Sequence, residues 1–199
     1  MKRLLFMLGV LAALLTFTQT SAAAVGVWTV DSLTRVFREQ PPRPRVEPEL
    51  SAARGEWESF QVVLTGSPSE LRGAKIKSSP LRGPSSAFIP APVVLREHYV
   101  RVRQSSPQSP LPAGDYPDPL VPQHFSEQAL PSAAQVNQPF WVDVFVPYGT
   151  PPGSYRGELH VELPQAQEQS LAFTLAVWPF DLPVVPAMRS SFLLGCRRV

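Results

Sequence analysis

The sequence predicts an all-β domain, a two-sheet antiparallel β-sandwich of immunoglobulin-like architecture. About seven runs of residues alternate between apolar and polar side chains, which is the period of a strand with two different faces. Prolines and glycines separate these runs at the spacing that sandwich turns have. We find no amphipathic helix of useful length. Because some runs carry apolar residues on both faces, two packed sheets are the most economical way to bury them.

Residues 140–163 contain the clearest strand pattern. The first run places one set of apolar side chains on one face: Phe140, Val142, Val144 and Val146. A turn-rich segment, PYGTPPG, follows at residues 147–153. In the second run, one face carries Tyr155, Leu159, Val161 and Leu163. We interpret the two runs as an antiparallel pair in one sheet with one solvent-exposed face.

The other runs are expected to form further strands. The opening strand covers residues 25–37, and a loop with four prolines covers residues 39–49. A strand at residues 50–65 is apolar on both faces, which predicts a place near the middle of the sandwich. Shorter patterns predict strands at residues 73–78, 92–103 and 170–180, followed by an extended connector at residues 181–186. Residues 104–138 are interpreted as a long proline-rich loop, a kind of segment that is often functional.

Residues 1–24 have the features of a cleaved secretory signal peptide. A basic start precedes an apolar run from Leu4 to Leu15, and small residues end the segment, so cleavage is expected after Ala22 or Ala24. The apolar run is shorter than the roughly 20 residues that a membrane span needs. We therefore expect an exported protein, periplasmic or extracellular, with no membrane attachment after cleavage. The expected division is a signal peptide at residues 1–24, a β-sandwich at 25–183 and a connector with the start of a further domain at 184–199.

Charge and cysteine content exclude several classes of function. Removing Lys2 and Arg3 with the leader reduces the 18 basic residues to 16, which equals the 16 acidic residues. A neutral chain gives no electrostatic reason to expect a nucleic-acid partner. Cys196 is the only cysteine, so no internal disulfide can form, and it has no neighbouring histidine that would activate it as a nucleophile.

No cofactor and no metal are expected. The three histidines, His98, His124 and His160, are far apart in the sequence and lack the spacing of metal ligands. Neither a glycine-rich phosphate loop nor a serine-nucleophile elbow is present.

Two groups of carboxylates are candidates for a site. Glu56 and Glu58 flank Trp57 and are expected about 6.6 Å apart on one strand face. Glycoside hydrolysis needs two carboxylates at a defined separation, so the pair is a candidate for that chemistry. A charged strand edge explains the two residues as well. Asp115 and Asp118 bracket Tyr116 in the long loop. Carboxylates beside an aromatic ring suit the hydroxyls and apolar faces of sugars, although Asp and Pro are also ordinary turn residues. We therefore name Asp115, Tyr116 and Asp118 as a candidate carbohydrate or domain contact.

Four stretches of the chain occur together, and in the same order, in a known bacterial domain. They are AARGEWESFQ at residues 52–61, YPDPL at 116–120, FWVDVFVP with PGSYRG within 140–157, and VWPFDLP at 177–183. These resemble the motifs of the domain that precedes the catalytic barrel in glycoside hydrolase family 123 and in related proteins of unknown function. The resemblance covers nearly all of the chain after the leader and implies an N-terminal β-sandwich.

The resemblance implies no catalytic residue in this chain. In that family a (β/α)8 barrel after the sandwich cleaves β-linked N-acetylgalactosamine, using an adjacent Asp-Glu pair that assists the substrate's own acetamido group. This sequence contains no adjacent Asp-Glu pair. A barrel takes ~250 residues, far more than follow Pro183. The expected partners are therefore a glycan or a catalytic barrel encoded downstream.

Three functional hypotheses follow. The first is a non-catalytic N-terminal module of an exported β-N-acetylgalactosaminidase-like glycoside hydrolase, in a truncated or split protein. The second is a stand-alone exported carbohydrate-binding module that uses the loop around Tyr116. The third, the weakest, is a residual enzyme that uses Glu56 and Glu58. The first also predicts poor solubility or self-association, because a surface that normally docks on a barrel would be exposed.

Overall fold

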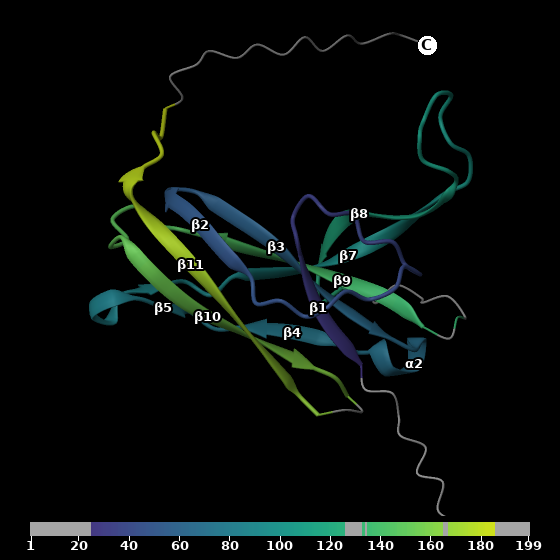
Figure 1. Ribbon diagram of the computed structural model, residues 1–199, viewed down its shortest axis with the longest axis horizontal. Coiled ribbons are helices and arrows are strands. Elements are labelled where there is room, and N and C mark those ends of the chain that lie inside the picture. Colours follow the sequence, from purple (N-terminus) through teal and green to yellow (C-terminus); the bar gives the residue numbers. More distant parts are fainter. Residues whose placement is uncertain (1–24, 126–132, 134, 165–166, 186–199) are drawn as a thin grey trace, which may run out of the picture.

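The chain folds into a two-layer β-sandwich, as predicted (Figure 1). The computed structural model describes residues 25–125, 133, 135–164 and 167–185. Sheet A has the strand order β1-β3-β9-β7-β8, with bounds β1 (Gly26–Asp31), β3 (Trp57–Gly66), β9 (Val136–Phe145), β7 (Val93–Val102) and β8 (Gly114–Pro122). Sheet B has the order β2-β11-β10-β5-β6, with bounds β2 (Glu49–Arg54), β11 (Gln169–Asp181), β10 (Gly153–Glu162), β5 (Leu81–Arg82) and β6 (Phe88–Ile89). β4 (Lys75–Ser78) also pairs with β10.

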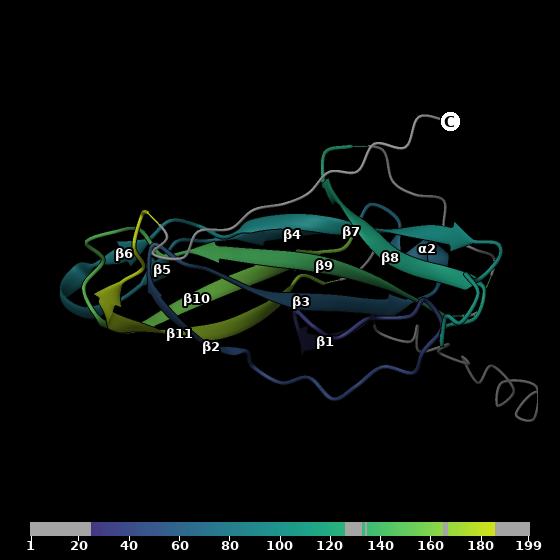
Figure 2. The same cartoon turned by 90° about the horizontal axis from the view of Figure 1, so that it is seen from above.

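The core fills the space between the two sheets, which Figure 2 shows from above. The alternating apolar side chains of β3 and β9 face those of β10 and β11, and Phe60 meets Phe173 with ring centroids 5.2 Å apart. Every apolar residue that the pattern of residues 140–163 assigned to an inward face is buried. The inward position between Tyr155 and Leu159 is Gly157, because a Cβ there would lie 2.2 Å from the ring of Phe173.

The predicted antiparallel pair within residues 140–163 is wrong. β9 pairs with β3 and β7 in sheet A, whereas β10 pairs with β11, β4 and β5 in sheet B. Residues 146–152 therefore cross from one sheet to the other. Both strands bury one face in the same core, so their alternation is the same as in a hairpin, although no hydrogen bonds join them.

Residues 50–65 form two strands instead of one. Gly55 has φ +83°, a conformation that favours glycine, and it ends β2 before β3 begins at Trp57. β2 lies at the edge of sheet B, and β3 lies inside sheet A with neighbours on both sides. β2 also runs parallel to β11, so sheet B is mixed, not purely antiparallel. The expectation that β3 lies inside the sandwich is confirmed.

The interpretation of residues 104–138 as one long loop is also wrong, because β8 lies within it and pairs with β7. β8 contains Pro117, Pro119 and Pro122, which conceal the strand pattern in the sequence. They are compatible with a strand here because β8 is the edge of sheet A, where one side of the backbone needs no partner. The pairing shifts register between Glu97↔Leu120 and Tyr99↔Pro117, so Asp118 and Pro119 form a bulge opposite His98.

Residues 32–40 form a partial third layer on the outer face of sheet A (Figure 1). Side chains of the sheet hold this segment by its backbone carbonyls. Asn137 Nδ2 donates to Phe37 O and Gln40 O at 2.9 and 2.8 Å, and the Tyr99 hydroxyl donates to Val36 O at 2.9 Å. A small second core of Trp28, Val36 and Val63 lies beneath the segment.

The remaining elements are short. α2 (Pro68–Leu71) begins with a capping box between Ser67 and Glu70, and a 3₁₀ turn covers Pro84–Ser86. No helix among the described residues has the length and apolar character that a membrane crossing requires. The predicted signal peptide, Cys196 and residues 186–199 lie outside the described residues, so the predictions that fall on them stand untested.

Candidate functional site

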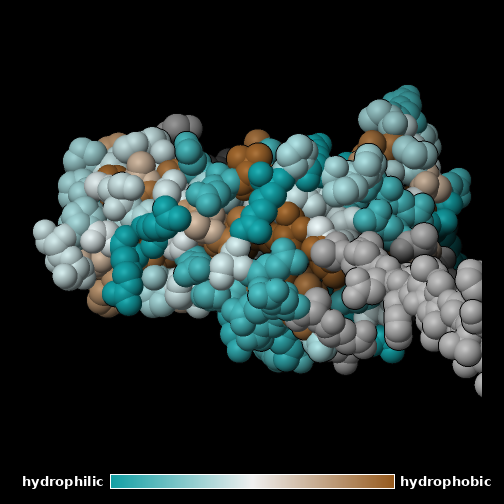
Figure 3. Space-filling view, turned by 60° about the horizontal axis from the view of Figure 1, so that its bottom comes forward, coloured by the Kyte–Doolittle hydropathy of each residue, from teal (hydrophilic) through white to brown (hydrophobic). Residues whose placement is uncertain are grey.

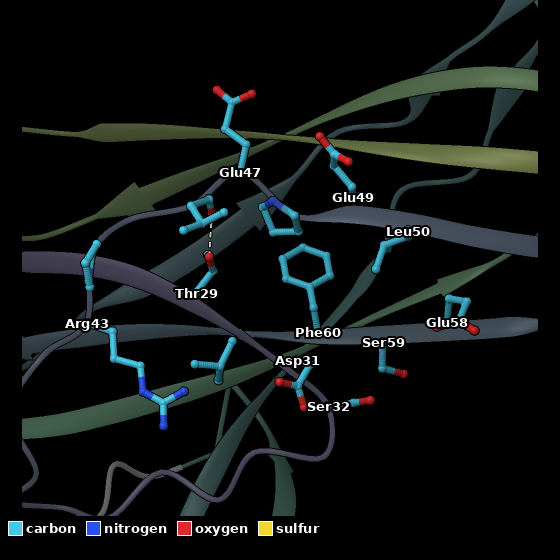
Figure 4. Close-up of a pocket in the computed structure, with 14 residues that line it drawn as sticks. Thr29, Asp31, Ser32, Arg43, Glu47, Glu49, Leu50, Glu58, Ser59 and Phe60 are labelled. Carbon is cyan, nitrogen blue, oxygen red and sulfur yellow. Dashed lines mark hydrogen bonds between the residues drawn. The ribbon is translucent and has the colours of Figure 1, made fainter.

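An open groove of about 800 Å³ lies between β1, β3 and the segment that leads into β2 (Figure 4). Phe60 and Leu50 form an apolar part of its lining. Four carboxylates also line it: Asp31, Glu47, Glu49 and Glu58. Figure 4 shows Glu47 and Glu49 pointing away from Asp31, and Glu58 separate from all three. The groove therefore holds no pair of carboxylates directed at one point.

The Glu56 and Glu58 side chains have different environments. Glu56 lies in the turn before β3 and not on the strand as expected, and its Oε2 accepts a hydrogen bond from Ala53 N at 2.7 Å. Glu58 lies on β3, where burial, and then the charge of Glu56, raises the pKa of its carboxyl group. Glu56 therefore stabilises the turn between the two sheets, and the structure gives no geometric support for a catalytic pair.

A second cavity, of about 450 Å³, lies on the outer face of sheet A, beneath residues 32–35 and beside β8. We call it the outer-face cavity. Its sheet side is lined by Gln61 from β3, Trp141 from β9 and Glu97 from β7. Arg35 and Asp118 line it as well, and both are exposed. Five segments, residues 32–35 and strands β3, β7, β8 and β9, thus supply one polar hollow.

Glu97 is the unusual group in the outer-face cavity. Only 6% of its surface is exposed, and burial raises the pKa of its carboxyl group to about 7. Its Oε1 is buried, and no hydrogen-bond donor in the described part of the chain reaches it. Perturbed, buried carboxyl groups in hollows are candidates for functional sites.

The three predicted site residues lie along β8 but have different surroundings. Asp115 forms ion pairs with Arg38 at 3.7 Å and with Arg101 at 3.2 Å. The Tyr116 ring packs edge-on against Phe37 with centroids 5.7 Å apart, and its hydroxyl donates to Pro112 O. Asp118 alone lines the outer-face cavity, from the bulge of β8.

A third hollow, of about 310 Å³, adjoins the outer-face cavity. Arg35, Pro117 and Asp118 line both, and Tyr116 and Ser105 line the third hollow only. The predicted residues Tyr116 and Asp118 therefore do share one hollow, and Asp115 lies outside it.

Sequence reasoning missed Glu97 and Gln61. The available signal was weak: Glu97 occupies a strand position between Leu95 and Tyr99, on the face where a buried strand would carry an apolar residue. Gln61 lies on the outer face of β3 between Ser59 and Val63. Neither pattern distinguishes a covered face from a solvated one.

The histidines do not form a site. His98 lies on β7, His124 packs beside Phe125, and His160 lies 3.0 Å from Glu168. Within the described ranges, no three His, Cys, Asp or Glu side chains lie close enough to hold a metal ion.

The end of the sandwich where β11 finishes is rich in exposed aromatic rings, and we call it the aromatic end. Its members are the exposed Trp57, Tyr148, Trp178 and Phe180 and the half-buried Phe145. Trp57 and Phe145 are 4.9 Å apart by ring centroid, and Trp178 stacks on Phe180 at 5.7 Å. In Figures 1 and 2 the start of β3 and the end of β11 lie at the same end, on the left.

Polar contacts hold the aromatic end together. Arg54 forms an ion pair with Asp181, Leu182 N donates to Arg54 O at 2.8 Å, and the Tyr148 hydroxyl donates to Leu182 O at 3.1 Å. Three of the four motif stretches described above, residues 52–61, 140–157 and 177–183, therefore meet here.

Comparison with known proteins shows a distant likeness of fold. No protein-family model matches the sequence, and no curated protein matches it. Among solved structures, the chain resembles a family 123 glycoside hydrolase from Clostridium perfringens, whose structure was analysed for its hydrolysis of glycolipid glycans. The TM-score is 0.56 at 13% sequence identity, over 80% of this chain and 28% of that chain. The likeness shows a shared fold, and this chain spans little more than a quarter of the length of that enzyme.

Proposed function

We propose that the chain is a non-catalytic β-sandwich module of an exported glycoside hydrolase related to family 123, and that its aromatic end packs on a catalytic barrel. Two facts support the proposal. The chain has the fold of one part of such an enzyme and corresponds to 28% of it. Three of the four stretches that resemble motifs of that family meet at the aromatic end, where large rings are exposed.

The exposed rings carry the proposal. Trp57 is 56% exposed, and Tyr148, Trp178 and Phe180 are exposed to similar degrees. On the face drawn in Figure 3, brown residues gather mainly near the middle, and hydrophilic residues cover much of the rest. Clustered exposed aromatic residues on a monomer are typical of an interaction surface, and Trp and Tyr supply much of the binding energy at such surfaces.

The local structure also favours docking. The contacts between Arg54, Asp181 and Leu182 fix the last residues of β11 against the β2–β3 turn. A rigid exit from the sandwich would hold a following domain in one orientation, which a flexible linker would not.

The test uses light scattering on the purified chain. We expect concentration-dependent self-association, because association between copies removes the exposed rings from water. The double variant Trp57→Ser, Trp178→Ser is expected to reduce this association. Val46→Ser is the matched control, since Val46 is 61% exposed and lies away from the aromatic end. A chain that stays monomeric at high concentration, or variants that make no difference, would contradict the proposal.

Two further measurements concern catalysis and the partner. We expect no hydrolysis of aryl β-N-acetylgalactosaminides by this chain. The proposed partner is a barrel containing an adjacent Asp-Glu pair, encoded in the same gene or a neighbouring one; a genome without such a barrel would contradict this part of the proposal.

A second candidate is a stand-alone carbohydrate-binding module, and the hollow of about 310 Å³ favours it. Tyr116, Asp118, Arg35 and Ser105 line this hollow, and an aromatic ring with acidic, basic and hydroxyl groups suits a sugar. Calorimetry with amino-sugar glycans is expected to show heat that Tyr116→Ala reduces. No heat with any glycan would remove this candidate without affecting the first.

A further inference from the structure

The outer-face cavity contains two buried oxygen atoms that lack hydrogen-bond donors. They are Glu97 Oε1 and Gln61 Oε1, and neither has a partner among the described residues. The Glu97 and Gln61 side chains are 6% and 2% exposed, and both line the cavity. A buried polar atom without a partner destabilises the fold, so two on one cavity are unusual unless a ligand pairs with them.

Two side-chain donors on the sheet side of the cavity, from Gln61 and Trp141, are already engaged. Gln61 Nε2 donates to Asp31 O at 3.0 Å and to Thr34 O at 2.7 Å, which also fixes the orientation of its amide. Trp141 Nε1 donates to Asp143 Oδ1 at 2.6 Å. The sheet side of the cavity therefore offers acceptors and no free side-chain donor from Gln61 or Trp141.

This imbalance selects the chemistry of the ligand. A hydroxyl group both donates and accepts, and Gln61 and Trp141 have no free donor for its oxygen, so that donor would have to come from Arg35 or Ser32 of the covering segment. A carboxylate or phosphate would face Glu97 and Asp118 as like charges. An ammonium group has three donors and no acceptor, and its charge complements the buried carboxylate.

The rest of the lining suits the body of such a ligand. Trp141 presents an aromatic ring, and Pro117 and Leu120 supply apolar wall from β8. An aromatic face attracts a cation and packs against carbon atoms. The exposed Asp118 adds a second negative charge to the lining, and the exposed Arg35 adds one positive charge.

We propose that the outer-face cavity binds the protonated primary amine of a small organic ligand, with Glu97 and Gln61 accepting its hydrogen bonds and Trp141 packing against its body. The proposal is independent of the docking role given to the aromatic end, which lies elsewhere on the sandwich. Two sources of the amine share this chemistry: an amino sugar with a free amino group, and a linear alkylamine.

The experiment compares amines with their neutral counterparts on the purified chain. Glucosamine and butylamine are titrated near neutral pH, and N-acetylglucosamine and butanol serve as uncharged controls. Binding is measured by calorimetry and by the NMR signal of the Trp141 indole N–H. We expect saturable binding of at least one amine and a shift of that signal, with neither neutral compound producing them. Binding of glucosamine alone identifies the amino-sugar source, and binding of butylamine alone the alkylamine source.

Variants test the residues. Glu97→Gln keeps the shape of the side chain and removes its charge, and it is expected to weaken amine binding by about tenfold or more. Glu49→Gln, an exposed carboxylate in the other groove, is the control and is expected to bind as the unaltered chain does. No saturable binding of either amine, equal binding of a neutral counterpart, or unchanged binding by Glu97→Gln overturns the proposal. The comparison of charged and neutral ligands uses the unaltered chain, so it holds even if Glu97→Gln does not fold.

Discussion

The ring of Tyr148 lies directly over Gly55. A Cβ placed on Gly55 would be 2.4 Å from Tyr148 Cζ, and Gly55 itself has φ +83°. This contact joins the turn between β2 and β3 to the segment that crosses between the sheets. The same tyrosine donates its hydroxyl proton to Leu182 O, so the Gly55–Tyr148 contact also positions the end of β11.

Gly55→Ala is therefore expected to destabilise the fold and to displace Tyr148. The left-handed backbone conformation alone costs about 1–2 kcal/mol for a residue with a Cβ, and the clash adds to it. Gly149→Ala is the matched control, because Gly149 has φ +78° but no atom within 4 Å of its Cβ position. Urea unfolding is expected to show a larger loss for Gly55→Ala than for Gly149→Ala; equal losses would mean that Tyr148 moves aside without cost.

Glu97 is expected to make stability depend on pH. Its pKa is raised from 4.5 to about 7 in the folded chain because burial disfavours the charged form. The folded state thus binds the proton more tightly than the unfolded state does. The stability associated with that proton is fully present below pH 4.5 and is lost as the pH rises to about 7.

The measurement compares the unaltered chain with Glu97→Gln, whose side chain does not titrate. The unfolding free energy of Glu97→Gln minus that of the unaltered chain is expected to rise by up to about 3 kcal/mol as the pH increases from 4.5 to about 7. Taking the difference cancels the pH dependence contributed by the carboxyl groups that the two proteins share. A difference that does not vary with pH would show that the Glu97 carboxyl group is solvated in solution.

Asp115 and Asp118 are expected to differ in their effect on stability. Asp115 faces the buried guanidinium of Arg38, so Asp115→Asn should lower the unfolding free energy by about 1–2 kcal/mol. Asp118 is exposed and has no such contact among the described residues, so Asp118→Asn should change stability by less than about 0.5 kcal/mol. Arg101→Gln is the control for the exposed half of the Asp115 pair, with an expected loss below about 1 kcal/mol. Equal effects of the two Asn variants would contradict a structural role for Asp115.

The sequence by itself determined the fold class and the apolar face that each main strand turns to the core. Alternation with a period of two is a local property, since successive side chains of a strand point to opposite faces wherever the strand lies. For that reason the inward sets of β3, β9, β10 and β11 could be identified before the structure was known. The two packed sheets followed because strands that are apolar on both faces need cover on both sides.

Only the tertiary structure decided which strands are partners. Residues 146–152 could close a hairpin or cross between sheets, because both arrangements bury the same alternate residues; the structure shows the crossing. Likewise, the prolines of β8 are incompatible with a central strand and compatible with an edge strand. The local sequence pattern does not show whether a strand lies at an edge, so β8 could not be predicted from it.

The outer-face cavity was beyond sequence reasoning for a related reason. A charged residue on a strand usually faces water, and Glu97 would do so if residues 32–40 did not cover sheet A. That cover depends on hydrogen bonds from Gln61, Tyr99 and Asn137 to backbone carbonyls of residues distant in the chain. Burial, and with it the raised pKa of Glu97, thus arises from a contact between distant segments, which local sequence patterns do not specify.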